Sequence, residues 1–191
     1  MKIQHLAVVA FVAAFLSGCI TLPPMNFAVP NVGISQKKIE ADLKSTSVTL
    51  ASPEERTGKI PDGTEVGIAK LWQSGLNDTL NRTAIFRDDA ERKVNLSVKI
   101  LKLDLPGAGI SMTTETAARY EIIDRKTGEI LFTQDIASSG TTPFDYSLAG
   151  PRRAVESVNR AVQNNIAQFL EVLKTVDLHK PMPPAGAGTS K

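Results

Sequence analysis

The chain has 191 residues, of which 22 are basic and 20 acidic, and it contains a single cysteine. The near balance of charge argues against a nucleic-acid-binding protein, which usually carries a basic excess. One cysteine cannot form an internal disulfide and leaves no second thiol to ligate a metal.

The first 18 residues predict a secretory signal peptide. Lys2 supplies a positive charge, residues 6–16 form an uncharged apolar run, and small residues precede Cys19. This order is typical of a signal peptide, and the run is shorter than the roughly 20 residues that span a bilayer. A buried core helix is the alternative, but prolines follow soon after.

The end of this segment resembles the lipobox of bacterial lipoproteins, in which Leu, a small residue and Gly or Ala precede a Cys. The matching residues are Leu16, Ser17, Gly18 and Cys19. The resemblance implies cleavage between Gly18 and Cys19, a diacylglycerol on the thiol, and usually a fatty acid such as palmitate on the new amine. Three acyl chains would bury roughly 40 methylenes at about 0.8 kcal/mol each, so anchoring would be practically irreversible. The alternative is a small apolar residue at the end of an ordinary signal.

The residue after the cysteine bears on location. In enteric lipoproteins an Asp at this position tends to retain the protein in the inner membrane, whereas this chain has Ile20. The resemblance therefore implies the outer membrane, with the domain on the periplasmic side. No later apolar run is long enough to span a bilayer.

Composition divides the rest of the chain into three parts. We expect residues 19–43 to be the lipidated cysteine and a tether, because residues 21–36 contain prolines and no charge. We expect residues 179–191, rich in Pro, Gly and Ala, to be a disordered tail. Residues 44–178 then form a single domain of ordinary size.

The first half of this domain predicts a strand and a helix. Alternation predicts a strand over residues 44–52. Asp62 and Glu65 have the spacing of a capping box, and a stripe with a spacing of four follows, formed by Ile68, Trp72, Leu76 and Leu80. We expect Trp72 to lie in the core rather than serve as a ligand platform.

Three strands are predicted next. In residues 93–105 the apolar phase changes by one residue after Ile100, which indicates a β-bulge. Residues 111–124 place Ala118, Tyr120 and Ile122 on one face, and Asp124 to Gly128 form a hairpin turn. Residues 129–138 return as a strand with its apolar face formed by Ile130, Phe132 and Ile136.

A long helix ends the domain. Pro151 suits its first position, and its apolar stripe consists of Val155, Val158, Val162, Ile166, Phe169 and Leu173. The order β-α-β-β-β-α predicts an α+β two-layer sandwich, with a mostly antiparallel sheet and both helices on one face.

The sequence offers no catalytic constellation. The one histidine of the mature chain, His179, lies in the expected tail, and no nucleophile-elbow, phosphate-loop or dinucleotide motif is present. Pro106 to Ile110 contains two glycines but no lysine, which favours a plain loop over a phosphate site. We therefore expect no enzyme activity, no cofactor and no metal.

Four residues are candidates for a partner contact. Arg152 and Arg153 lie in the first turn of the last helix, the unfavourable end for a cation. They indicate either an anion or partner contact, or a solvated face with an Arg152–Glu156 pair. Phe144 and Tyr146, in the preceding loop, either fold back on the core or form a partner surface.

Together, the lipobox, the predicted domain and the strand Ala118 to Asp124 followed by a Thr-Gly hairpin and a long helix resemble small Gram-negative envelope lipoproteins. The outline is similar to YajG-like lipoproteins, the LPS-assembly lipoprotein and the amino-terminal domain of TolB. The resemblance implies a non-catalytic accessory of envelope assembly or transport that binds another envelope protein. A binder or carrier of a lipid or other amphipathic ligand is the alternative.

Overall fold

Four strands form one sheet in the order β1-β2-β3-β4. They are β1 (Asp42–Leu50), β2 (Lys93–Asp104), β3 (Met112–Asp124) and β4 (Ile130–Thr142). Helix α2 (Glu65–Thr83) connects β1 to β2, and α3 (Gly150–Leu173) follows β4. Because α2 is a crossover connection, β1 runs parallel to β2, while the other two pairs are antiparallel.

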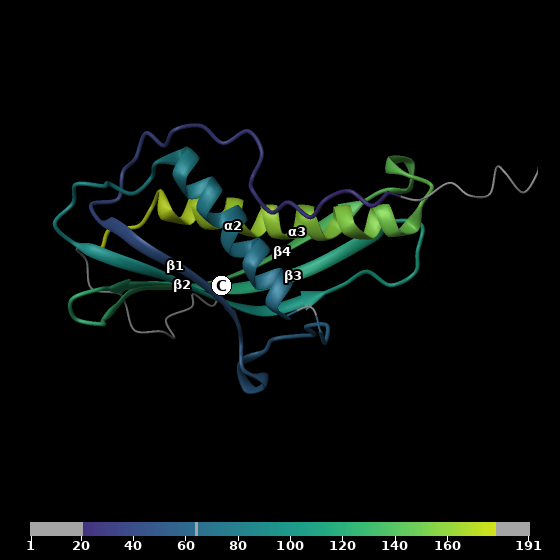
Figure 1. Cartoon of the computed structure of the whole chain (residues 1–191), viewed down its shortest axis with the longest axis horizontal. Helices are drawn as coiled ribbons and strands as arrows, with labels where there is room; N and C mark the ends of the chain where they lie inside the picture. Colours follow the sequence, from purple (N-terminus) through teal and green to yellow (C-terminus); the bar gives the residue numbers. More distant parts are fainter. Residues whose placement is uncertain (1–20, 64, 179–191) are drawn as a thin grey trace, which may run out of the picture.

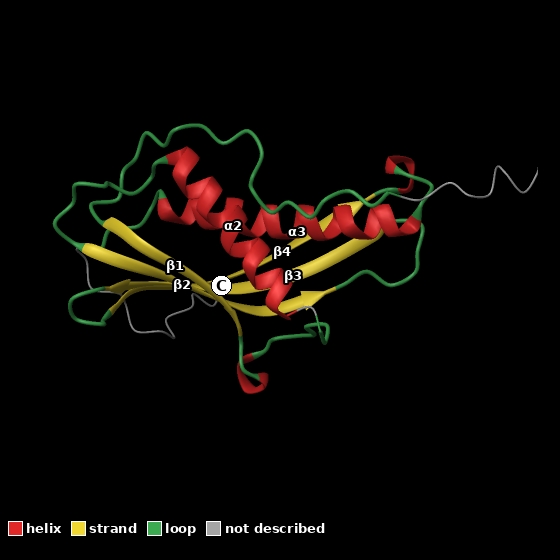
Figure 2. Ribbon diagram, viewed as in Figure 1, coloured by secondary structure: helices red, strands yellow, loops and turns green. Residues whose placement is uncertain are grey.

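Both helices cover the same face of the sheet (Figures 1 and 2). The predicted α+β class and element order are thus confirmed. The computed structural model describes residues 21–63 and 65–178, so the expected signal peptide, Cys19 and the tail from residue 179 lie outside it. No helix in the described part is long and apolar enough to cross a bilayer.

The core lies between the sheet and the two helices. Trp72 of α2 is fully buried, as predicted, and its indole N–H donates to the Tyr120 hydroxyl on β3 at 3.4 Å. That hydroxyl donates to Oδ1 of Asn165 on α3 at 2.8 Å, and the Tyr120 ring stacks on Phe169 with centroids 4.0 Å apart. A single buried tyrosine thus contacts both helices.

Bulges in β2 and β4 change the phase of these two strands. Ile100 pairs with Ala118 and Lys102 with Ala117, so Leu101 is the extra residue of β2, as the sequence predicts. A second register shift near the start of β4 leaves Leu131 unpaired. Because a bulge reverses the side-chain alternation, Ile130 is 47% exposed, and its predicted place on the apolar face is wrong.

The hairpin between β3 and β4 forms as predicted. Oδ1 of Asp124 accepts hydrogen bonds from the backbone N–H groups of Lys126 and Thr127, and Gly128 has a φ of 76°. Left-handed backbone at this position favours glycine. The turn therefore sets the register of the two strands.

The segment before β1 is packed, contrary to the expected tether. It runs along the two helices (Figure 1), and Phe27, Val29, Ile39 and Ala41 are buried in the core. The Phe27 ring meets the Trp72 ring edge-on, with centroids 6.4 Å apart. An uncharged sequence with spaced apolar residues can be buried as well as extended. Here it is buried because its side chains and backbone find partners on both α2 and α3.

Candidate functional site

The first turn of α3 holds the beginning of the described chain. The Arg152 guanidinium donates from Nε to the Thr21 carbonyl at 2.7 Å and from Nη2 to the Thr21 hydroxyl at 2.9 Å. The expected Arg152–Glu156 pair is absent, because Glu156 accepts instead from Nε of Arg160 at 2.8 Å. Arg152 therefore contacts the chain's own amino-terminal segment.

Arg153 is buried and cannot serve as an open partner contact. It is 5% exposed and donates to the Ser147 carbonyl at 2.5 Å and to the Gly109 carbonyl at 3.3 Å. Its guanidinium carbon lies 5.1 Å from the centre of the Phe144 ring, a cation–π distance. Arg153 thus joins two loops to α3.

The two loop aromatics do not fold back on the core. Phe144 and Tyr146, the ends of the short 3-10 helix η2 (Phe144–Tyr146), are 47% and 45% exposed. The Tyr146 ring lies 5.5 Å from the guanidinium carbon of Arg160. The partner-surface interpretation of these aromatics remains, whereas the core interpretation is wrong.

Sequence reasoning missed two further side chains of this surface. Leu148 is 83% exposed and Ile110 is 76% exposed. Ile110 lies in the loop that the sequence favoured as plain. The sequence did contain a signal for them: Ile110 and Leu148 are large aliphatic residues in loops where no apolar periodicity predicts burial.

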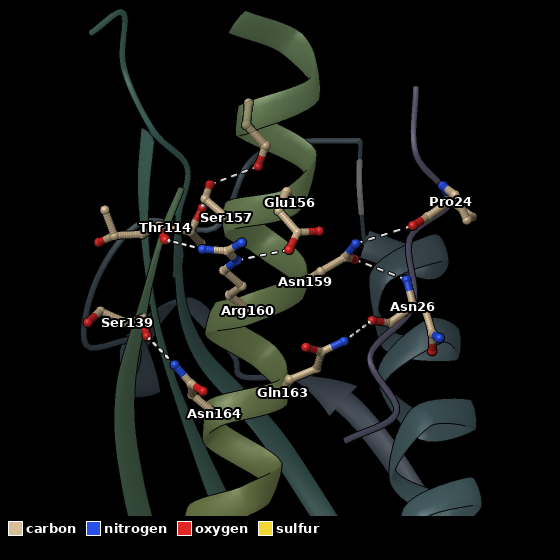
Figure 3. A network of polar contacts seen from close by, with 12 residues as sticks. Pro24, Asn26, Thr114, Ser139, Glu156, Ser157, Asn159, Arg160, Gln163 and Asn164 are labelled. Atoms are coloured by element: carbon tan, nitrogen blue, oxygen red, sulfur yellow. Dashed lines mark hydrogen bonds and ion pairs between the residues drawn. The ribbon is translucent and has the colours of Figure 1, made fainter. Parts of the chain in front are cut away.

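Polar side chains of α3 bond to segments on both of its sides (Figure 3). On one side, Asn159 accepts from the Asn26 N–H and donates to the Pro24 carbonyl, at 3.0 and 3.2 Å. Gln163 donates to the Asn26 carbonyl at 2.8 Å. These bonds satisfy the backbone of a segment that belongs to no sheet or helix.

On its other side, α3 covers part of the outer edge of β4. Arg160 donates to the Thr141 carbonyl at 2.9 Å, and Asn164 donates to the Ser139 carbonyl at 2.8 Å. These carbonyls point away from β3. Because strand groups alternate with a period of two, the backbone groups of Thr133, Asp135 and Ala137 also point outward.

In the half of β4 nearer to Ile130, Asn165 of α3 donates to the Ile136 carbonyl at 2.8 Å. By the same alternation this carbonyl points toward β3, so the outward groups of this half lack such cover. Within the described chain, the one side-chain hydrogen bond to an outward backbone group there is from the Gln134 amide to the Asp135 carbonyl, at 3.1 Å. We call the stretch Ile130–Ala137 the free edge. An uncovered edge is a ready template for another extended chain.

The titratable groups do not indicate proton-transfer chemistry. The carboxyls with a shifted pKa all have it lowered by hydrogen bonds from lysine, arginine or backbone N–H groups: Asp42, Glu54, Glu55, Asp89, Glu115 and Asp124. A general acid at neutral pH needs a raised pKa. Among the described residues no cluster of His, Cys, Asp or Glu could hold a metal ion.

No family model matches the chain, and no curated protein matches its sequence. The chain is similar in fold to a protein from Xanthomonas campestris of the family DUF330. That structure has 7% identity, a TM-score of 0.54 and covers 76% of this chain and 91% of its own. This likeness shows the fold alone.

Two further similar structures are a candidate lipoprotein from Caulobacter crescentus and a minor lipoprotein from Acinetobacter baumannii. The first has 13% identity and a TM-score of 0.43, and covers 68% of this chain and 88% of its own. The second has 12% identity and a TM-score of 0.42, and covers 69% and 93%.

Proposed function

We propose that this chain is a non-catalytic accessory lipoprotein of the cell envelope. It is anchored to the outer membrane through lipid on Cys19, faces the periplasm and binds another envelope protein. The lipobox sequence supports the anchor. The absence of a catalytic or metal-binding cluster among the described residues is compatible with a binding role.

The free edge of β4 is the observation that carries the binding proposal. Its outward N–H and C=O groups at Thr133 and Ala137 have no partner shown in the described chain, whereas α3 side chains cover the carbonyls at the other end of the same strand. A partner segment can therefore add as a fifth strand, with main-chain hydrogen bonds supplying affinity. The exposed Ile130 side chain adds an apolar contact at the start of the strand.

The position of this edge suits a partner from the periplasm. β4 ends at Thr142, close to the first turn of α3 and to Thr21, whereas Ile130 lies at the opposite end of the sheet (Figure 1). Thr21 follows the predicted anchor, Cys19, by two residues. The free edge therefore lies at the end of the sheet that is farther from the anchor. A partner can reach the edge without displacing the membrane contact.

The carrier alternative has less support. A lipid carrier needs an apolar cavity between the sheet and the helices. That space is filled by Trp72, Tyr120 and Phe169, each with no exposed surface.

The test is an affinity pull-down of the tagged lipoprotein from gently cross-linked cells, with mass spectrometry of both proteins and lipids. Two variants of Thr133 sharpen it. Thr133→Pro removes one outward N–H without breaking the ladder to β3, and edge strands tolerate proline. Thr133→Val retains the N–H and is the matched control.

One specific envelope protein, recovered with the wild type, with Thr133→Val and with the secreted Cys19→Ala form but lost with Thr133→Pro, supports the proposal. Thermal unfolding of both variants checks that they fold. Equal recovery with Thr133→Pro contradicts binding at this edge. Lipid in stoichiometric amount with no protein partner contradicts the accessory function and favours the carrier.

A further inference from the structure

One end of the domain exposes a group of large apolar side chains. We define the apolar end as Leu22, Ile110, Phe144, Tyr146 and Leu148, which are 54%, 76%, 47%, 45% and 83% exposed. Five of the nine large hydrophobic side chains exposed in the described chain belong to it. Contiguous apolar surface on a monomer usually marks an interaction site.

Two adjacent arginines hold the three segments of the apolar end together. Arg152 bonds Thr21, the neighbour of Leu22. Arg153 bonds the carbonyls of Gly109 and Ser147, the neighbours of Ile110 and Leu148. Its guanidinium also lies over the Phe144 ring. Because both arginines stand in the first turn of α3, the apolar end has a fixed shape.

The apolar end lies beside the predicted lipid anchor. Cys19 precedes Thr21 by two residues, and two trans peptide units keep their Cα atoms within about 7.6 Å of each other. Figure 1 shows the start of the described chain at the same end of the molecule as η2. Acyl chains on Cys19 would therefore enter the bilayer within reach of these side chains.

The charge pattern fits a lipid surface. Residues 21–36 and 105–111 carry no charge, and Asp145 is the one charged residue of 143–150. Apart from Asp145 and the neighbouring Arg152 and Arg160, few ions must therefore be desolvated when this end enters the headgroup region. Tyrosine is enriched at membrane interfaces because its ring is apolar and its hydroxyl stays hydrated.

We infer that the apolar end inserts into the lipid interface next to the Cys19 anchor, so that the domain stands on the membrane in one orientation. Leu148 and Ile110 enter deepest, Phe144 and Tyr146 lie at the headgroup level, and the free edge of β4 faces the periplasm. The inference rests on the lipidation of Cys19, which belongs to the proposed function. The domain would then be held at the membrane by both the lipid on Cys19 and the apolar end, and not by a flexible tether alone.

Depth-dependent quenching in vesicles tests this orientation. In the mature lipidated protein Cys19 is acylated, so Leu148→Cys introduces a single free thiol that takes an environment-sensitive nitrobenzoxadiazole label. Ile130→Cys, at 47% exposure on the opposite end, is the matched control. Ile110→Cys gives a second, independent site at the apolar end. The vesicles contain phosphatidylethanolamine and phosphatidylglycerol, with or without nitroxide lipid.

We expect nitroxide lipid to quench the labels at Leu148 and Ile110 several-fold more than the label at Ile130, with a blue-shifted emission at the first two sites. Equal quenching at both ends overturns the inference. A blue-shifted emission of the label at Leu148 without nitroxide quenching also overturns the inference, since a protein and not lipid would then cover this end. Mass spectrometry of the same sample separates the two failures: a chain without acyl groups contradicts the anchor itself, and the inference with it.

Discussion

The backbone N–H of Asn26 donates a 3.0 Å hydrogen bond to the side chain of Asn159, a residue 133 positions later in the chain. The same side chain donates to the Pro24 carbonyl, and Asn159 is 5% exposed. One buried amide thus satisfies two backbone groups of a segment without secondary structure. Through this contact the residues that follow the anchor become part of the folded domain.

We predict that Asn159→Ala detaches the amino-terminal segment. Two partly buried backbone groups each lose a hydrogen bond, and each such bond contributes about 0.5–1.5 kcal/mol. Urea denaturation measures the loss, and limited proteolysis should show faster cleavage within residues 21–36. Asn164→Ala removes an exposed amide from the other side of α3 and is the control, with an expected loss of at most about 1 kcal/mol. Equal proteolysis of both variants would contradict this role of Asn159.

Gly75 allows the same segment to approach α2. A Cβ at this position would lie 2.5 Å from the carbonyl carbon of Phe27 and 2.7 Å from the N of Ala28. We therefore predict that Gly75→Ala destabilises the fold, although alanine in a helix interior is favoured over glycine by about 1 kcal/mol.

Gly67 of the same helix gives the matched comparison. A Cβ there meets nothing within 4 Å, so Gly67→Ala should stabilise the protein by up to about 1 kcal/mol. Thermal unfolding of the two variants should give shifts of opposite sign. A higher melting temperature for Gly75→Ala would show that the segment moves away at little cost.

The periodicity of apolar residues predicted the helices and strands of this fold. Features that depend on contacts between distant segments could not be predicted from the sequence. The stripe of α2 and the phase change after Ile100 depend on neighbours along the chain, so they were read correctly. The packing of Phe27 depends on contacts with Trp72 and Gly75, which exist only after α2 is in place. No local pattern distinguishes such a segment from a free tether.

The candidate surface was predicted in part, for a similar reason. Phe144 and Tyr146 were recognised as loop aromatics, but the sequence did not show that they stay exposed beside the guanidinium groups of Arg153 and Arg160. Arg152 and Arg153 carry the same charge and lie in the same helix turn. Arg152 nevertheless contacts Thr21, whereas Arg153 is buried between loops. The sequence could not separate these roles because the partners lie on other segments.

Burial raises the pKa of the Tyr120 phenol well above its usual range. The folded state therefore favours the neutral phenol. Its contribution to stability is fully present below the unfolded pKa of about 10 and is lost as the pH rises toward the folded pKa. We predict that the wild type becomes less stable as the pH rises above about 10.

Tyr120→Phe tests this linkage. At neutral pH we expect it to cost about 1–3 kcal/mol, because Asn165 loses its hydroxyl partner in the core. Above about pH 10 the difference between the two proteins should narrow, since the variant has no phenol to ionise. Urea denaturation over this range measures the difference. A constant difference would show that the pKa of the Tyr120 phenol is the same in the folded and unfolded states, and thus that burial does not raise it.

The residue after the lipidated cysteine should control which membrane holds the protein. We predict that Ile20→Asp moves the lipoprotein toward the inner membrane in an enteric host, because that host retains lipoproteins with Asp at this position. Density-gradient separation of the two membranes, followed by immunoblotting, measures the shift. Ile20→Ser changes the polarity without adding a charge and serves as the control. Cys19→Ala should release the protein into the soluble periplasmic fraction. If a Cys19→Ala protein whose signal peptide has been cleaved instead stays with the membranes at the wild-type level, lipid on Cys19 is not the anchor.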